Sequence, residues 1–205
     1  MTDLFAYRVI PVAVVEDAAT AEPLGQALVA GGLPVAEVTL RTEAAVEAIA
    51  VMSRIDGLLV GAGTVVSVDQ VDQAISAGAR FIVSPGLRAD VVRRAQEAQI
   101  PVVPGAVTPS EIMQARALSL DTVKFFPASV YGGPSAIRAL AAPFVGMTFI
   151  PTGGVSPQNL GDYLSLPCVP AVGGSWMVPS HLIAAGAYDQ ISGLCAEAVA
   201  AAAAC

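Results

Sequence analysis

Lys124 is the only lysine among the 205 residues of this chain. It lies in the segment Thr122–Pro127 (TVKFFP), between Val123 and two phenylalanines. Desolvation in such apolar surroundings disfavours the ammonium form of a lysine. The neutral amine is a nucleophile that can form a Schiff base with a carbonyl compound. The alternatives are a lysine at a sheet edge whose ammonium reaches water, or one half of a structural ion pair.

A second candidate group lies in the segment Val35–Arg41. Side chains alternate between the two faces of a strand, so Glu37, Thr39 and Arg41 share one face. Polar side chains on one face of a buried strand need partners or a polar cavity. Glu37 is a candidate to shuttle protons, and Arg41 is a candidate to hold a carboxylate through two hydrogen bonds. A structural ion pair of Glu37 with Arg41 or with Lys124 is the alternative.

Three glycine motifs follow apolar segments. Gly61–Thr64 matches the dinucleotide motif G-x-G-x-x-G only in part, because Val66 replaces the third glycine, so we predict no dinucleotide site. Its small residues would let a ligand approach the backbone, and Thr64 adds a hydroxyl. Pro151–Gly154 and Gly173–Ser175 end two later segments, where backbone N–H groups are suited to phosphate. The sequence has no G-x-x-x-x-G-K-[ST] motif, which argues against nucleoside triphosphate chemistry.

Short β-branched segments alternate with Ala-rich amphipathic segments along the whole chain, so eight strand–helix units are expected. We expect strands at Val9–Val15, Val35–Leu40, Leu58–Val65, Phe81–Ser84, Pro101–Pro104, Thr122–Phe126, Thr148–Pro151 and Val169–Val172. We expect helices near 18–30, 43–55, 68–77, 88–98, 109–119, 134–142 and 157–165, and from 188 to the end.

Eight strand–helix units predict parallel strands with right-handed crossovers, as in a compact (β/α)8 TIM barrel. An open doubly wound sheet is the alternative. Composition changes nowhere along the chain, so we expect a single domain over residues 1–205. In such a barrel the chemistry lies at the carboxyl ends of the strands.

Polar and small residues mark several expected helix ends. Thr42, Thr108 and Ser156 are expected N-caps, and the last two are followed by a proline in the first turn. The pair Gly31-Gly32 and Gly78 are expected to follow helices in left-handed turns.

Composition excludes several classes of protein. Hydrophobic residues make up 55% and charged residues 13%, which argues against disorder, and the net charge of -7 argues against nucleic-acid binding. The longest uncharged segment, Tyr163–Tyr188, contains three prolines and a Gly-Gly pair, so we expect no membrane span. Three scattered cysteines and His181, the single histidine, form no metal-ligand pattern. No secretory signal is evident, so we expect a cytoplasmic protein.

The chain resembles the class I 2-keto-3-deoxy-6-phosphogluconate (KDPG) aldolases, also known as bifunctional KHG/KDPG aldolases, over essentially its whole length. The motifs that carry the resemblance occur in the family's order and spacing: Glu37–Thr42 (EVTLRT), Gly61–Val65 (GAGTV), Ser84–Leu87 (SPGL), Pro104-Gly105, Lys124–Pro127 (KFFP), Pro151–Val155 (PTGGV) and Gly173–Trp176 (GGSW).

The resemblance implies a function and a site. The reaction is the Schiff-base cleavage of KDPG to pyruvate and D-glyceraldehyde 3-phosphate in the Entner–Doudoroff pathway, with 4-hydroxy-2-oxoglutarate (KHG) as a further substrate. It implies a homotrimeric barrel that needs no cofactor and no metal. It implies Lys124 as the Schiff-base lysine, Glu37 as the general acid/base, and Arg41 and Thr64 as ligands of the pyruvyl carboxylate. Pocket walls at Pro85 and Phe126, and a phosphate site at Thr152, Gly153, Gly154, Gly174 and Ser175, complete the implied set.

Two features depart from the family pattern. Relatives often have a longer leader helix, whereas only Met1–Arg8 precede the first expected strand, which leaves open how the lower end of the barrel is closed. Many relatives also have an arginine near Val14. The alternatives are an aldolase for the galactonate epimer of the substrate, a phosphosugar isomerase or epimerase, and a non-catalytic barrel that binds a phosphorylated metabolite.

Overall fold

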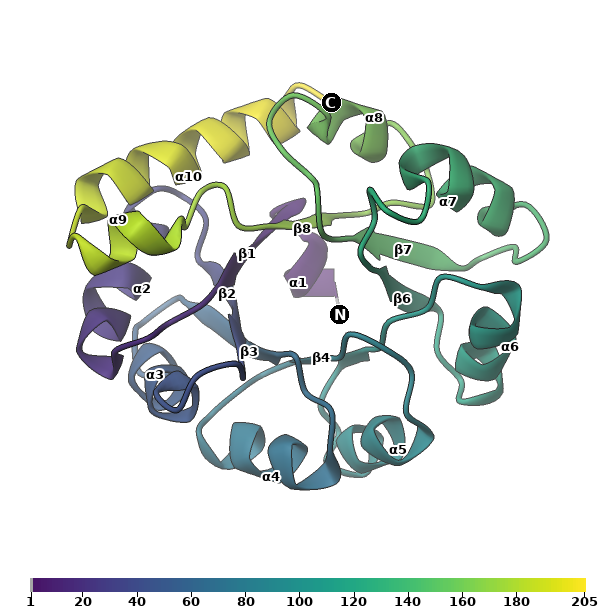
Figure 1. Ribbon diagram of the computed structural model, residues 1–205, viewed down its shortest axis with the longest axis horizontal. Coiled ribbons are helices and arrows are strands. Elements are labelled where there is room, and N and C mark those ends of the chain that lie inside the picture. Colours follow the sequence, from purple (N-terminus) through teal and green to yellow (C-terminus); the bar gives the residue numbers. More distant parts are fainter. Residues whose placement is uncertain (1) are drawn as a thin grey trace.

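The computed structural model describes residues 2–205 and has eight strands, arranged as a curled parallel sheet with helices on its outside (Figure 1). Six strands form one sheet in the order β5-β4-β3-β2-β1-β8, and β6 pairs with β7. The strands are β1 (Val9–Ala13), β2 (Val35–Thr39), β3 (Leu59–Gly63), β4 (Ile82–Val83), β5 (Val102–Val103), β6 (Thr122–Phe125), β7 (Thr148–Pro151) and β8 (Val172–Gly174).

Neighbours in the sheet follow the order of the chain, and the first strand pairs with the last through Val9 and Val172. A doubly wound sheet instead reverses its strand order at a switch point, so this alternative is excluded. Two single bridges connect the separate strand pair to the larger sheet. One joins Gly105 to Lys124 of β6, and the other joins Thr152 to Gly173 of β8.

The helices lie outside the strands, with the exception of α1 (Figure 1). They are α1 (Thr2–Phe5), the 3-10 helix η1 (Ala18–Thr20), α2 (Ala21–Ala30), α3 (Ala45–Met52), α4 (Val68–Ser76), α5 (Ala89–Glu97), α6 (Pro109–Ala117), α7 (Gly133–Ala141), α8 (Leu160–Leu164), α9 (Ser180–Ala184) and α10 (Tyr188–Ala203). The sequence predicted neither α1 nor α9, and it predicted the five-residue α8 only as part of a longer helix near 157–165, because such short segments carry little periodicity.

The expected caps are confirmed in part. Thr108 and Glu111 form a reciprocal capping box at the start of α6, as the Thr-Pro-Ser-Glu sequence indicates. Gly32 and Gly78 have the positive φ angles, 72° and 95°, that end helices in a left-handed turn. The prediction for Thr42 is wrong, because its hydroxyl donates instead to the carbonyl oxygen of Val15 at 2.5 Å.

Two expected boundaries in the last third of the chain are also wrong. The helix expected from 157 begins at Leu160 with Asn159 before it, so Ser156 is not its N-cap. The last strand was expected at 169–172 but pairs only over Val172–Gly174. Pro170 has no N–H to donate, and this prevents it from taking part in a regular parallel ladder.

Helix α1 lies within the ring of strands in Figure 1. Leu4 is buried, and with Phe5 it lines a very small cavity, about 10 Å³, whose other walls include Glu37 and Lys124. Arg8 fixes the start of the chain by donating to the carbonyl oxygens of Leu164 and Ala202. The short N-terminal segment therefore covers the lower end of the strands. Met1 lies outside the described residues.

The segment Tyr163–Tyr188 folds into the end of α8, then β8 and α9, and reaches the first residue of α10. No helix within residues 2–205 has both the length and the apolar character needed to cross a membrane.

Candidate active site

Lys124 and Glu37 form a buried ion pair. Lys124 lies in the middle of β6 and Glu37 in the middle of β2, and every residue of both strands is buried. The Lys124 Nζ lies 2.9 Å from Glu37 Oε1, and the two side chains are only 6% and 4% exposed. The Phe126 ring lies on the same amine, with its centroid 5.2 Å from Nζ. This arrangement holds an amine and a carboxylate within proton-transfer distance in a dry environment.

Glycine in β3 makes room for the carboxylate. In the sheet, Glu37 is the partner of Gly61, and a Cβ atom on Gly63 would overlap the Glu37 carboxylate. A Cβ atom on Gly61 would overlap the Phe81 ring. The expectation that these glycines let a ligand approach the backbone is therefore wrong, because Glu37 and Phe81 fill the space beside them.

Arg41 and Thr64 lie together at the ends of β2 and β3. Arg41 Nε donates to Thr64 Oγ1 at 3.2 Å, and the guanidinium is exposed. Thr39 was expected on the face of Glu37 and Arg41, but its hydroxyl donates to the carbonyl oxygen of Ala13 within the sheet. Thr39 is thus satisfied by the fold, while Arg41 is available to an anionic ligand.

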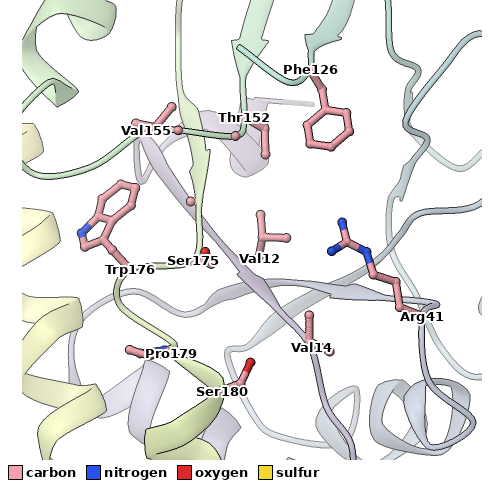
Figure 2. A pocket seen from close by; sticks show the side chains of 13 residues that line it. Val12, Val14, Arg41, Phe126, Thr152, Val155, Ser175, Trp176, Pro179 and Ser180 are labelled. Atoms are coloured by element: carbon pink, nitrogen blue, oxygen red, sulfur yellow. The ribbon is translucent and has the colours of Figure 1, made fainter. Parts of the chain in front are cut away.

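A pocket of about 490 Å³ opens at the carboxyl ends of the strands (Figure 2). Most of the expected substrate-binding residues line it: Arg41, Phe126, Thr152, Gly153, Gly154, Gly174 and Ser175. Figure 2 shows Arg41 and Phe126 on one side of this pocket and Ser175 and Trp176 on the other.

The Lys124–Glu37 ion pair lies deeper than this pocket. Lys124 and Glu37 line the small cavity above α1, and Thr152 lines both this cavity and the large pocket. The Thr152 hydroxyl is buried and has no hydrogen-bond partner among the described residues. Thr64 and Pro85 lie outside the lining of the large pocket, and the Pro85 carbonyl is packed against Gly105.

The glycine loops have the backbone that an anion site needs. Gly153 and Gly154 have φ angles of 88° and 79°, which residues with a side chain rarely adopt. A Cβ atom on Gly154 would also overlap the Ser129 side chain, and one on Gly174 would overlap the Trp176 ring. Glycine is therefore favoured by conformation at Gly153, by packing at Gly174, and by both at Gly154.

The pocket contains residues that were not expected from the sequence. They are Val12, Val14, Val155, Trp176, Pro179 and Ser180. The alternation of Val12, in β1, and Val14, just after it, was a usable signal, because both then face the same side as the pocket. Ser180 had no such signal, since α9 was not predicted.

Other chemistry-bearing groups lie apart from this site. Within the described part of the chain, no three His, Cys, Asp or Glu side chains gather as a metal site requires. Burial raises the pKa of the Cys195 thiol to about 12, so that it stays protonated at neutral pH. Cys168 and Cys205 are likewise free thiols.

Comparison with known proteins finds relatives that match most of this chain. A family model described as KDPG and KHG aldolase matches residues 2–194. The KHG/KDPG aldolase of Escherichia coli K12 is 48% identical over 192 residues, which cover 93% of this chain and 90% of that protein. The crystal structure of the Zymomonas mobilis ZM4 KDPG aldolase with 3-phosphoglycerate has a TM-score of 0.91 and 43% identity, covering 97% of this chain and 94% of that one.

A second structure shows a covalent intermediate. It is the KDPG aldolase of Legionella pneumophila with pyruvate captured at low pH as a carbinolamine. It is 40% identical to this chain with a TM-score of 0.91, and the match covers 94% of this chain and 95% of that one. On the family model and these identities, the chain belongs to the KDPG and KHG aldolase family.

Proposed function

We propose that this chain is a class I aldolase, a carbon–carbon lyase that cleaves KDPG to pyruvate and D-glyceraldehyde 3-phosphate. The observation that carries the proposal is the single lysine of the sequence, buried in the middle of β6 with its amine 2.9 Å from a buried carboxylate. Membership of the family and the pyruvate carbinolamine of the Legionella relative support it.

In the proposed reaction the neutral amine of Lys124 attacks the C2 ketone of the substrate and forms a carbinolamine. Loss of water gives an imine, whose protonated form accepts electrons. The C3–C4 bond then breaks, its electron pair moves into an enamine, and glyceraldehyde 3-phosphate leaves. Protonation of the enamine at C3 and hydrolysis of the imine release pyruvate and restore the amine.

Glu37 is the proposed general acid and base. The reaction requires proton transfers during carbinolamine dehydration, at the C4 hydroxyl and at C3. The Glu37 carboxylate is within hydrogen-bond distance of the amine and can serve these transfers in turn, with water as a relay. The Lys124–Glu37 contact also fits a purely structural ion pair, which the variants below distinguish.

The substrate has a carboxylate at one end and a phosphate at the other, and we propose that they bind at opposite ends of the pocket. We assign the pyruvyl carboxylate to Arg41 and Thr64, because a guanidinium binds a carboxylate with two hydrogen bonds. The phosphate is assigned to the backbone of Gly153, Gly154 and Gly174 and to Ser175. Thr152, Phe126 and Pro85 are the proposed walls between these ends.

KHG is the proposed second substrate, with pyruvate and glyoxylate as its products. The name of the Escherichia coli relative includes both activities. The cleavage uses the same pyruvyl end and the same lysine, so that only contacts to the distal end differ.

The assembly around the site is proposed as well. The bridges Gly105–Lys124 and Thr152–Gly173 support closure of the eight strands into a (β/α)8 barrel. We propose that residues 1–205 form one domain, that the protein is a cytoplasmic homotrimer as the family resemblance implies, and that it acts in the Entner–Doudoroff pathway.

The test is pyruvate release from three substrates: KDPG, its galactonate epimer and KHG. Fastest cleavage of KDPG, with slower cleavage of KHG, is the expected result. Preference for the epimer would move the assignment to the galactonate aldolase. No pyruvate from any substrate, in folded protein, would contradict the aldolase and favour an isomerase or a binding protein.

A further inference from the structure

The loop that follows β3 has an unusual backbone. Thr64 has a φ of 58°, in the left-handed region that a β-branched residue rarely adopts. Such a conformation persists only where the surrounding structure holds it, and it often marks a functional site. In this conformation the Thr64 hydroxyl accepts the hydrogen bond from Arg41 Nε.

Three hydrogen bonds hold the two residues after Thr64. Val65 N donates to Val83 O of β4 at 3.1 Å. Val66 N donates to the side-chain oxygen of Gln70 at 2.7 Å. Val66 O accepts from Arg88 Nη1 at 3.1 Å. The loop is thus fixed from β4, from α4 and from the residue that precedes α5.

Arg88 is itself held in place. It pairs with Asp90 through Nε and Oδ1 at 3.0 Å and through a second contact between Nη2 and Oδ2. Asp90 Oδ1 also accepts from the backbone N–H of Val91 at 2.9 Å, which ties the carboxylate to the first turn of α5. This planar, two-point pairing aims the remaining guanidinium nitrogen at Val66 O.

We infer that Arg88 is a positioning residue for the carboxylate-binding pair Arg41 and Thr64. By holding Val66 O, Arg88 keeps Thr64, two residues earlier in the same loop, in its left-handed conformation and the Thr64 hydroxyl against Arg41. Arg88 acts through the loop and lies outside the pocket lining. The inference rests on the proposed role of Arg41 and Thr64 in binding the carboxylate. It adds Arg88, in the loop after β4, as a residue that supports this role without touching the substrate.

The experiment measures trapping of pyruvate by borohydride as a function of pyruvate concentration, in the full-length chain. Three variants are compared with the unchanged chain: Arg88→Ala, Arg88→Lys and Arg93→Ala. Arg93 is the matched control, because it is an exposed arginine of α5, the helix that Arg88 directly precedes. Methyl pyruvate, which has the ketone but no free carboxylate, is the second ligand.

The Arg88→Ala variant should need about fivefold more pyruvate for half-maximal trapping, the effect of one lost hydrogen bond. Its maximal trapping rate should stay within about twofold. Arg88→Lys, which keeps one donor for Val66 O, should recover most of the loss. Arg93→Ala should match the unchanged chain, and methyl pyruvate should respond equally in all four proteins.

Three results would overturn the inference: unchanged pyruvate dependence in Arg88→Ala, an equal loss in Arg93→Ala, or an equal loss with methyl pyruvate. The last would indicate a general effect on the site rather than on the carboxylate. Failure of the unchanged chain to trap pyruvate at all would instead contradict the proposed aldolase, so the two failures are distinguishable.

Discussion

Two of the ion pairs in the molecule lie in opposite environments. Lys124 and Glu37 meet inside the ring of strands, with side chains 6% and 4% exposed. Arg88 and Asp90 meet at the protein surface, with side chains 56% and 48% exposed. Both are close contacts between a cation and a carboxylate, but water solvates only the second pair.

This difference in solvation matters because neither kind of ion pair is expected to add much to the stability of the fold. An exposed pair exchanges hydration for a screened attraction and contributes little to folding. A buried pair loses the hydration of both charges, and apolar side chains of similar size often stabilise a fold as well or better. The position of Lys124 and Glu37 is therefore better explained by the proposed reaction, which uses a buried amine beside a carboxylate, than by stability. Arg88 and Asp90 are explained by local positioning.

The largest expected effect comes from removing the buried cation. Lys124→Met should abolish turnover, because no other lysine can form the imine. It should also lower the free energy of unfolding by about 3–5 kcal/mol, because Glu37 is left buried without its partner. Denaturant unfolding and a pyruvate-release assay measure the two effects.

The matched control is the double variant Lys124→Met with Glu37→Leu, in which both charges are absent. It should recover the lost stability and remain inactive. A double variant as unstable as the single one would show that the ion pair itself holds the fold, which is the structural alternative.

The next effect concerns the carboxylate of the same pair. Glu37→Gln keeps the size of the side chain but removes its ability to accept and return protons. Turnover should fall about 100-fold or more, with the circular dichroism spectrum unchanged. Normal kinetics in this variant would remove Glu37 from the mechanism.

A smaller effect is expected at Arg41. This residue is exposed like Arg88, but we propose that it binds the pyruvate that reacts at the buried Lys124–Glu37 pair. Arg41→Ala should weaken pyruvate binding by about tenfold, because a charge-assisted contact is lost, while the fold is kept. Half-saturation of borohydride trapping measures the affinity. An unchanged affinity would refute the carboxylate site at Arg41 and Thr64.

The smallest effect belongs to the exposed pair. The hydrogen bond from Arg88 holds the pKa of Asp90 below its ordinary value. A carboxyl with a lowered folded pKa stabilises the fold above its unfolded pKa of about 3.9, and this contribution disappears as the pH falls through the folded value. Asp90→Asn should therefore lower the melting temperature slightly at pH 6 and low salt, and by less as the pH falls below about 3.9.

Glu43→Gln, a change at another exposed carboxylate, is the control for this comparison. The difference between the two variants at pH 6 should shrink with added salt, because exposed charges are screened. A large loss of stability in Asp90→Asn that is insensitive to salt would contradict the description of this pair as weak and solvated.

Much of the site could be predicted because its charged residues lie in sequence segments that are otherwise apolar. A lysine between apolar residues, and a glutamate in an alternating strand, are visible in the sequence without a structure. Their contact was foreseen only as one of two pairings, since Glu37 could equally have met Arg41. Which side chains meet across the strands depends on register and curvature, and local sequence does not determine these.

Other features depended on contacts between distant segments. The sequence suggests that Gly63 is a turn residue. In the structure the Glu37 carboxylate occupies the space that a Cβ atom on Gly63 would need. The strand expected from Val169 begins at Val172, since a short β-branched segment does not reveal where pairing starts. Ser180 enters the pocket from a five-residue helix that is too short for a periodic pattern.

The most direct test of the account is the site of covalent capture. The protein is incubated with pyruvate and borohydride, its intact mass is measured, and the adduct is located by peptide mapping. The account predicts one reduced pyruvate adduct per chain, on Lys124, and none in Lys124→Met. An adduct confined to the N-terminal amine, or no adduct in folded protein, would contradict Schiff-base chemistry at the buried pair.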